Sequence, residues 1–368
     1  MGCGKCDIVP EINDAFESIF IMLPTNHRRV TFENWLTNTL ITYKHFDDGY
    51  LIYTSSVDEF FGKYILNYFN SVEMKDVKLL PLKNKNEITF SDLKNFKSLK
   101  EWQDIINGKQ VIQIIKHQRI KTLFQPIIDI RNNEIYGYEA LNRGILPDGS
   151  LMQPGVLFSK AKEIDLLFNL DRICREASIK AASSQNIKSK IFINFIPTAI
   201  YQPELCLKST LQTLVDEHID PRQVVFEVVE SEKVVDYEHL NRILNYYRNK
   251  GFSVALDDIG SGYSNVEFLL NLKPDYMKID MSIIRGIDKS PDQQLILKEL
   301  VMHGRMLNQK ILAEGIETVE EYNYIKSQDI DLVQGFYFGK PSETPILQPL
   351  NHNPSEMEFS LKKNEENQ

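Results

Sequence analysis

Residues 224–258 read VVFEVVESEKVVDYEHLNRILNYYRNKGFSVALDD. The first six residues, Val224–Val229, have the length and the β-branched content of a buried strand. Residues 237–250 follow with apolar side chains at helical spacing before a glycine, and residues 253–257 form a second apolar run. A strand, a helix and a strand of these lengths predict two parallel strands joined by a crossover helix.

The same alternation extends to both sides of this unit, from about residue 111 to residue 345. Helices are expected at residues 165–183, 237–250 and 292–307. We expect strands at residues 122–130, 134–142, 190–195, 224–229, 253–257, 276–280, 311–314 and 332–334. Their number suits an α/β fold of the TIM-type (β/α)8 barrel class. The predicted domains are a smaller N-terminal α/β domain at 1–110, the barrel at 111–345 and a polar C-terminal tail at 346–368.

The N-terminal domain shows strand and helix patterns but no chemical motif. Strands are expected at residues 18–23, 50–54 and 77–82, and helices at residues 31–46, 58–69 and 93–106, the last ending at Asn107-Gly108. The sequence leaves open whether this domain senses a ligand, mediates dimerisation or docks a partner.

The charge and hydropathy of the chain exclude some classes of function. The formal net charge is −9 and no basic patch stands out, which disfavours binding to long nucleic acids. No run is long and apolar enough to span a bilayer, and no basic segment followed by an apolar run opens the chain. We therefore expect no membrane span and a cytoplasmic location.

The four cysteines fall into two groups. Cys174 and Cys206 lie in amphipathic helical patterns and are expected to be small core residues. Cys3 and Cys6 form a single C-x-x-C pair, for which two reduced thiols and a metal or redox site both remain open.

Polar side chains stand at or near the ends of most predicted strands. In a barrel these ends converge on one face, so the side chains should gather there. So many acidic oxygens would repel one another without cations, and hard divalent ions such as Mg²⁺ or Mn²⁺ prefer oxygen ligands. The residues are Glu139, Asn194, Glu227, Asp257, Asp258, Glu314 and Gln334.

Lys278 adds a cation to this set. It alternates with Met277 and Ile279, so if the apolar pair faces the outer helices, Lys278 points into the barrel. An inward lysine is costly unless carboxylates surround it. Each residue taken singly also fits a helix cap, a loop charge or a structural ion pair, whereas the set as a whole favours a catalytic metal site.

These residues lie in motifs that resemble, in order, those of EAL-domain cyclic di-GMP phosphodiesterases. The resemblance covers about Lys121 to Ser342. Its departures are Val229, Ile259 and Ser261, where the family usually has Thr, Phe and Thr, and none of them removes a metal ligand. The motifs are FQPI at 124–127, YEALNR at 138–143, INFIP at 193–197, FEVVE at 226–230, DDIGSGYSN at 257–265, KID at 278–280, AEGIE at 313–317 and QGF at 334–336.

The resemblance implies a role for each residue. Lys278, Glu314 and Glu139 would be catalytic. Glu230 would anchor the loop at 258–265, which in the family links metal binding to a dimer interface. Two Mg²⁺ or Mn²⁺ ions would be held by Glu139, Asn194, Glu227, Asp257 and Asp258. Substrate would be bound by Gln125, Arg143, Gln334, Phe336 and Pro341.

By this resemblance the chain would hydrolyse cyclic di-GMP to linear pGpG by a two-metal mechanism and would form a homodimer through the barrel. It would bind no nucleic acid beyond this dinucleotide. The main alternative is a catalytically inactive EAL-type receptor that binds cyclic di-GMP and signals through residues 1–110. Two further alternatives are a barrel phosphodiesterase for another substrate, such as a glycerophosphodiester, and a purely structural interaction protein, which gives no reason for an inward lysine.

Overall fold

The computed structural model describes two compact units of this chain. Among the described residues, one unit contains Ile120–Ile145 and the residues from Phe168 onward, and the other contains the residues of Ile8–Arg119 together with Leu146–Leu167. The described residues are 9, 17–24, 29–46, 49–54, 60–82, 92–197, 200, 202–229, 237–260 and 272–348.

The unit that begins at Ile120 is a closed barrel. Eight strands follow one another in the order β6-β14-β13-β12-β11-β10-β9-β7, and pairing between β6 and β7 closes the ring. This confirms the predicted barrel, with strand bounds close to those expected. The strands are β6 (Ile120–Asp129), β7 (Glu134–Ile145), β9 (Lys190–Phe195), β10 (Val224–Val229), β11 (Ser253–Ile259), β12 (Tyr276–Ile279), β13 (Lys310–Ala313) and β14 (Leu332–Gln334).

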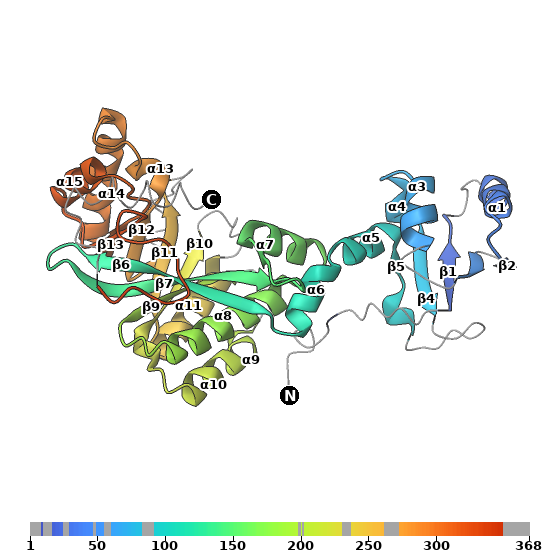
Figure 1. The fold of residues 1–368 in the computed structure, drawn as a ribbon, viewed down its shortest axis with the longest axis horizontal. Helices are drawn as coiled ribbons and strands as arrows, with labels where there is room; N and C mark the ends of the chain where they lie inside the picture. Colours follow the sequence, from blue (N-terminus) through green and yellow to red (C-terminus); the bar gives the residue numbers. More distant parts are fainter. Residues whose placement is uncertain are drawn as a thin grey trace. The chain divides into compact units, whose positions relative to one another are not determined.

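One strand departs from a fully parallel barrel. Strand β6 runs antiparallel to both β7 and β14, and β6 and β7 form a long hairpin (Figure 1). Only residues 130–133 join these two strands. A parallel pair would need a crossover of a dozen or more residues, so the short turn forces the hairpin.

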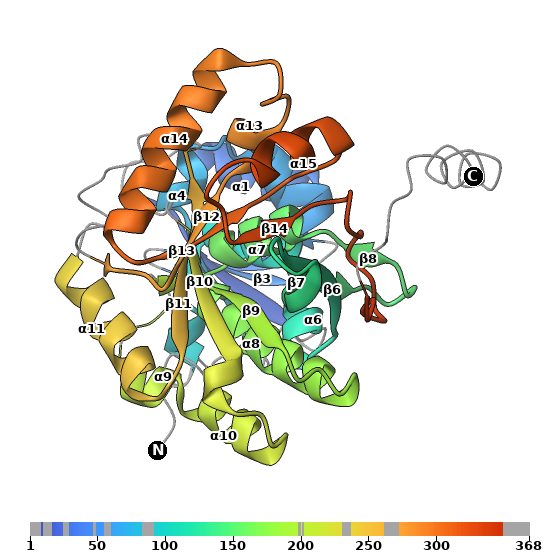
Figure 2. The ribbon, with the colours of Figure 1, turned by 90° about the vertical axis from the view of Figure 1, so that its left-hand side faces the viewer.

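Helices surround the strands of the barrel (Figure 2). Outward-facing strand residues such as Phe226, Met277 and Ile279 share one hydrophobic cluster with the helix residues Leu244 and Leu297. The helices are α8 (Leu167–Ser184), α9 (Pro203–Cys206), α10 (Lys208–Asp216), α11 (Tyr237–Asn249), α13 (Met281–Ile284), α14 (Pro291–Met306) and α15 (Val319–Lys326).

Cys174 in α8 and Cys206 in α9 behave as the sequence predicts, because both are free and buried. None of the helices in the described ranges is long and apolar enough to cross a membrane.

The second unit contains an antiparallel five-stranded sheet of order β2-β3-β1-β4-β5. Its strands are β1 (Ser18–Met22), β2 (Tyr43–Phe46), β3 (Gly49–Tyr53), β4 (Lys78–Leu82) and β5 (Lys97–Ser98). Its helices are α1 (Arg29–Asn38), α3 (Leu66–Tyr68), α4 (Glu73–Asp76), α5 (Leu99–Asn107), α6 (Lys109–Lys116) and α7 (Pro154–Glu163).

Helix α7 comes from between β7 and α8 in sequence, yet it belongs to this second unit, where Lys160 Nζ donates to the Asn107 carbonyl at 3.1 Å. A domain boundary near residue 110 stays a prediction.

Two helices expected in this unit are shorter than the sequence suggested. The helix expected at 31–46 ends at Asn38, because Leu40 adopts a left-handed conformation with φ 55° and the chain then enters β2. The helix expected at 93–106 begins only at Leu99. Its N-cap is Ser98, whose side chain accepts from the Glu101 amide, while the Glu101 carboxylate accepts from the Ser98 amide.

Substituting Ser98 by alanine should lower the free energy of unfolding of this unit by about 1 kcal/mol, because the first turn of α5 loses its cap. Urea unfolding followed by tryptophan fluorescence measures this directly, since the two tryptophans of the chain, Trp35 and Trp102, both lie in this unit.

Burial alone would raise the pKa of Glu101, but the hydrogen bonds from Ser98 lower it below its ordinary value. This stabilisation is present above the unfolded-state pKa of about 4.3 and is lost as the pH falls through the lower folded-state value. The difference between wild type and Ser98→Ala should therefore shrink in acid. Ser98→Thr keeps the acceptor and is the control, and an alanine variant as stable as Ser98→Thr would contradict the capping role.

Candidate functional site

The interior of the barrel is built in two layers. The first layer is apolar and receives one residue from most strands: Ile127, Phe192, Val225, Ala255, Tyr276, Leu312 and Leu332. Residues two apart on a strand face the same side, so the next inward residue of each strand forms a second layer. Every member of that layer is polar: Gln125, Asn194, Glu227, Asp257, Lys278, Glu314 and Gln334, with Glu139 paired in register with Gln125.

Lys278 lies at the centre of the polar layer with only 1% of its surface exposed. Its Nζ is 2.6 Å from Glu227 Oε1, 2.7 Å from Glu314 Oε1 and 3.0 Å from Asp257 Oδ1. Glu139 Oε1 is further away, at 4.0 Å. The structure therefore places the lysine inside the barrel, as its alternation with Met277 and Ile279 predicts.

The protonation of Lys278 follows from these neighbours. Burial alone would lower the pKa of its ammonium, but the surrounding carboxylates, with Asp257 and Glu139 contributing most, raise it well above its ordinary value. The side chain is therefore a permanent cation at neutral pH.

Amide side chains hold the carboxylate of Glu139 in place. Asn194 Nδ2 donates to its Oε1 at 3.2 Å, and Gln334 Nε2 donates to its Oε2 at 2.6 Å. Gln334 Nε2 also lies 3.2 Å from Gln125 Oε1, and Gln125 Nε2 donates to the Gly339 carbonyl at 3.3 Å. Asn194 uses its nitrogen here, so its side-chain oxygen is the atom that could accept a further contact.

Glu227 is the most deeply buried carboxylate of the layer, with none of its surface exposed. Burial raises its pKa well above the ordinary value, and the nearby Lys278 opposes that shift only in part. Burial has the same effect on the pKa of Glu314. One ammonium thus faces more negative charge than it can neutralise, which leaves the site short of positive charge.

Asp257 and Asp258 lie at an irregularity of β11. The register between β11 and β12 shifts between Leu256 and Ile259, and Asp258 has a left-handed φ of 60°. Burial, followed by the charges of Asp257 and Asp280, raises the pKa of Asp258 to about 6. The bulge brings two consecutive carboxylates to the rim, where an ordinary strand would turn one of them outward.

Whether these residues fit a divalent cation can be tested on their donor atoms. Within the described ranges no three His, Cys, Asp or Glu side chains stand as a metal-ligand set, and Lys278 lies between the carboxylates. The donors nevertheless fit a hard cation, because all are carboxylate or amide oxygens. In addition, Glu227 Oε2 is buried with no hydrogen-bond partner in the described part of the chain.

Glu321 is a supporting residue that the sequence reasoning missed. Its carboxylate accepts from the amides of Gly286, Glu317 and Thr318 at 2.9, 2.9 and 3.1 Å. Its contact with Gly286 reaches the segment that follows β12, the strand of Lys278. Its contacts with Glu317 and Thr318 reach the segment that begins with Glu314 after β13. Glu321 therefore connects these two segments. The Thr318-x-x-Glu321 capping box was the sequence signal that could have revealed it.

Gly315 follows Glu314 with a φ of 76°, and a β-carbon there would lie 2.2 Å from Cβ of Met281. Only glycine fits this close approach, so the course of the chain directly after Glu314 is fixed by residue type.

The other predicted site residues lie on β7 and after β14. Arg143 is half-buried, its Nη1 donates to the Asn142 carbonyl at 3.0 Å, and burial lowers its pKa while Glu139 opposes that shift. Phe336 is 49% exposed, with Lys340 Nζ 5.5 Å from its ring centre, and Pro341 is half-buried. Glu230, Cys3 and Cys6 lie outside the described residues, as does the predicted loop beyond Gly260.

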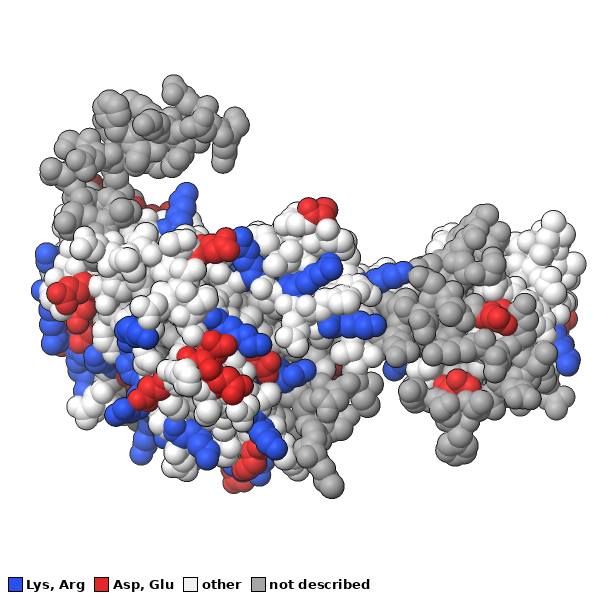
Figure 3. All heavy atoms as spheres, turned by 60° about the horizontal axis from the view of Figure 1, so that its bottom comes forward, with Lys and Arg blue, Asp and Glu red and all other residues white. Residues whose placement is uncertain are grey.

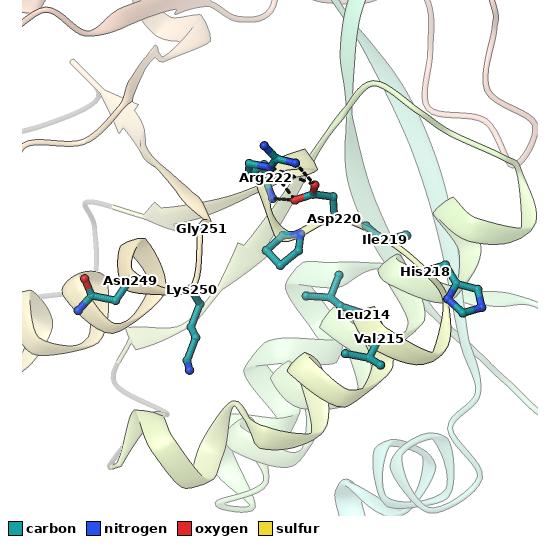
Figure 4. Close-up of a pocket in the computed structure, with 10 residues that line it drawn as sticks. Leu214, Val215, His218, Ile219, Asp220, Arg222, Asn249, Lys250 and Gly251 are labelled. Atoms are coloured by element: carbon teal, nitrogen blue, oxygen red, sulfur yellow. Dashed lines mark hydrogen bonds and ion pairs between the residues drawn. The ribbon is translucent and has the colours of Figure 1, made fainter.

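A hollow of about 680 Å³ lies elsewhere on the barrel (Figure 4). Leu214 and Val215 of α10 line it, and Asp220 holds Arg222 beside it through an Nε–Oδ2 hydrogen bond of 3.0 Å. Arg222 and Gly251 shortly precede β10 and β11, so the hollow is at the amino ends of the strands, away from the polar layer. It takes no part in the site.

Lys, Arg, Asp and Glu side chains are interspersed on the face of the barrel unit in Figure 3, without a continuous basic surface there. The expectation that this chain binds no long nucleic acid stays a prediction.

Lys278→Met should destabilise the barrel by about 3–5 kcal/mol near pH 8 without added metal ion, because it leaves buried carboxylates uncompensated. Burial already raises the pKa of Glu227 and Glu314, so the folded variant binds protons more tightly than the unfolded chain. The loss of unfolding free energy relative to wild type should therefore become smaller as the pH falls towards about 5. Scanning calorimetry across this pH range measures the effect.

Lys310→Met is the matched control, since Lys310 is an exposed lysine that opens β13. It should stay within about 1 kcal/mol of wild type at every pH. If Lys278→Met unfolds at the same temperature as this control near pH 8, the central role of the buried ammonium would be contradicted.

Comparison with known proteins gives consistent matches. The sequence profile described as EAL domain matches residues 109–341. The "Probable cyclic di-GMP phosphodiesterase PdeG" of Escherichia coli is 32% identical over 240 residues, which are 62% of this chain and 45% of that protein. The chain spans less than half the length of the curated relatives it matches first.

Among solved structures, a standalone EAL protein from Vibrio cholerae in its c-di-GMP-bound form matches with a TM-score of 0.57 and 36% identity. That match covers 66% of this chain and 97% of the other. Klebsiella pneumoniae BlrP1, in a complex with calcium and cyclic di-GMP, matches with a TM-score of 0.58 over 90% of this chain and 97% of its own. At 19% identity it shows a shared fold only.

Proposed function

The chain belongs to the EAL domain family, and on that premise we propose that it hydrolyses cyclic di-GMP to the linear dinucleotide pGpG. The observation that carries this proposal is the buried polar layer, in which Lys278 forms ion pairs with Glu227, Asp257 and Glu314. A structural role alone would be better served by apolar residues of similar volume, because a buried charge cluster is costly.

The cation site is proposed at the oxygens of the polar layer. Glu139, Asn194, Glu227, Asp257 and Asp258 would hold two Mg²⁺ or Mn²⁺ ions. Such ions would lower the pKa of a bound water and would place positive charge near the phosphate oxygens. The oxygen-only donor set and the Glu227 Oε2, which has no hydrogen-bond partner among the described residues, support this assignment.

Lys278 acts on the attacking water. The surrounding carboxylates raise its pKa well above the ordinary value, and as an ammonium it would donate hydrogen bonds to the water. Glu314 lies 2.7 Å away and fixes its direction. The ammonium then offsets the negative charge that develops on the phosphate as the ribose 3′ oxygen leaves.

Substrate contacts are assigned to the residues at the rim. Arg143 carries a guanidinium that can grip a phosphate through two hydrogen bonds. Gln125 and Gln334 present amides in the polar layer. Phe336 is half-exposed directly after this layer and would offer its ring to a guanine, and Pro341 is assigned a further apolar contact.

The assembly and setting of the enzyme are also proposals. We expect a homodimer through the barrel, a cytoplasmic location and a regulatory or sensory role for residues 1–110, with Glu230 anchoring the loop at 258–265.

Glu139→Gln tests the proposed function. The change keeps shape and removes charge, so pGpG formation in Mn²⁺ or Mg²⁺ should fall by roughly 100-fold or more while the fold is retained. Chromatographic separation of pGpG from cyclic di-GMP measures the rate. The matched control is Glu134→Gln, an exposed glutamate at the start of the same strand, which should keep the wild-type rate.

Each other outcome has a defined meaning. Undiminished hydrolysis by Glu139→Gln would refute the site. Wild-type protein that binds cyclic di-GMP tightly in Mn²⁺ without forming pGpG would identify the inactive receptor. Hydrolysis of a glycerophosphodiester in place of cyclic di-GMP would assign a different substrate to the same barrel.

A further inference from the structure

A second buried ion pair lies in α8, outside the polar layer. Arg175 and Asp171 are 0% and 2% exposed, and Arg175 Nε donates to Asp171 Oδ2 at 2.9 Å. Burial alone would lower the pKa of Arg175, but Asp171 keeps it above its ordinary value, so the pair stays ionised. Such a pair adds little to stability compared with apolar residues, so its presence calls for another reason.

The pair connects three elements of the barrel unit. Asp171 Oδ1 accepts a hydrogen bond from the Ile196 amide at 3.0 Å. Arg175 Nη1 donates to Thr210 Oγ1 of α10. The carboxylate is therefore fixed by its own helix and by α10, and it offers its second oxygen to the chain directly after β9.

The Ile196 amide needs this partner. Strand β9 ends at Phe195, so the next amide lies beyond the hydrogen-bonded ladder, and Ile196 is partly buried, where an amide without an acceptor is costly. The ring of Phe195 packs on Tyr247 at a centroid distance of 5.1 Å. The end of β9 is thus held from both sides, two residues after Asn194, whose side chain meets Glu139 at 3.2 Å.

We propose that Asp171 is a positioning residue for the cation site, which fixes the end of β9 and thereby the ligand Asn194. The proposal rests on the proposed function, because Asn194 matters only if the polar layer binds a cation. Residues that orient ligands typically change metal affinity by about 10- to 100-fold when they are lost.

Two double variants distinguish the effect of the hydrogen-bond acceptor at position 171 from the effect of the charges of the Asp171–Arg175 pair. Asp171→Leu with Arg175→Met replaces the pair by apolar residues, which the interior can accept, but removes the acceptor for Ile196. Asp171→Asn with Arg175→Gln is also neutral and keeps an oxygen at the same position. Thr213→Val is the control for a lost buried hydroxyl on α10, since the Thr213 hydroxyl donates to the Ser209 carbonyl of the same helix.

The readouts are exchange of the Ile196 amide in metal-free protein, by NMR, and binding of Mn²⁺ alone, followed by electron paramagnetic resonance of the free ion. The apolar variant should lose protection at Ile196 and bind Mn²⁺ roughly 10- to 100-fold more weakly. The amide variant and Thr213→Val should stay within about threefold of wild type. Circular dichroism and thermal unfolding establish that each variant folds.

The outcomes distinguish this proposal from the proposed function. If wild type binds Mn²⁺ and the apolar variant binds it equally well, the positioning role is overturned and the proposed function stands. If the amide variant is as weak as the apolar one, charge and not the acceptor is decisive, which also overturns the proposal. A wild-type protein that binds no Mn²⁺ would overturn both.

Discussion

The structure depends on one buried ammonium that must satisfy carboxylates from neighbouring strands. Lys278 reaches Glu227, Asp257 and Glu314 within 3.0 Å, and these contacts exist only when β10, β11, β12 and β13 keep their register. Any slip by one residue would turn these side chains to the outer face, where the helices pack. The charge cluster and the barrel therefore require each other, and the deficit of positive charge makes the same place attractive to cations.

The sequence was sufficient for the parts of the fold that follow from periodicity. Apolar runs of strand length located the barrel strands, and the alternation around Lys278 gave its direction. It also placed the polar residues at the strand ends, because parallel strands end at one rim. Predictions failed where a single backbone conformation or a cap overrode the periodicity. Leu40 stops α1 although the apolar spacing continues, and Ser98 starts α5 later than the pattern implies.

The residues that support the site were harder to find for a different reason. Glu321 and Asp171 accept hydrogen bonds from backbone amides of other segments. A backbone amide leaves no trace in the identity of the residue that carries it. The capping box therefore marks Glu321 as a partner of Thr318 but not of Gly286, and no pattern of side chains marks Asp171 as the partner of Ile196. The bulge at Asp257-Asp258 is similar, because its register shift depends on β12 as well as on β11.

The hairpin of β6 and β7 has a consequence for how the chain is made. Its first strand also pairs with β14, the last strand of the ring, and Gln125 meets Gln334, 209 positions later in the chain, across this seam. During synthesis the nascent barrel therefore carries two open edges until its final strand leaves the ribosome. Such edges are prone to pair with other chains. Glu139 receives its second amide only when β14 joins the ring, so the polar layer is completed by the last strand of the barrel.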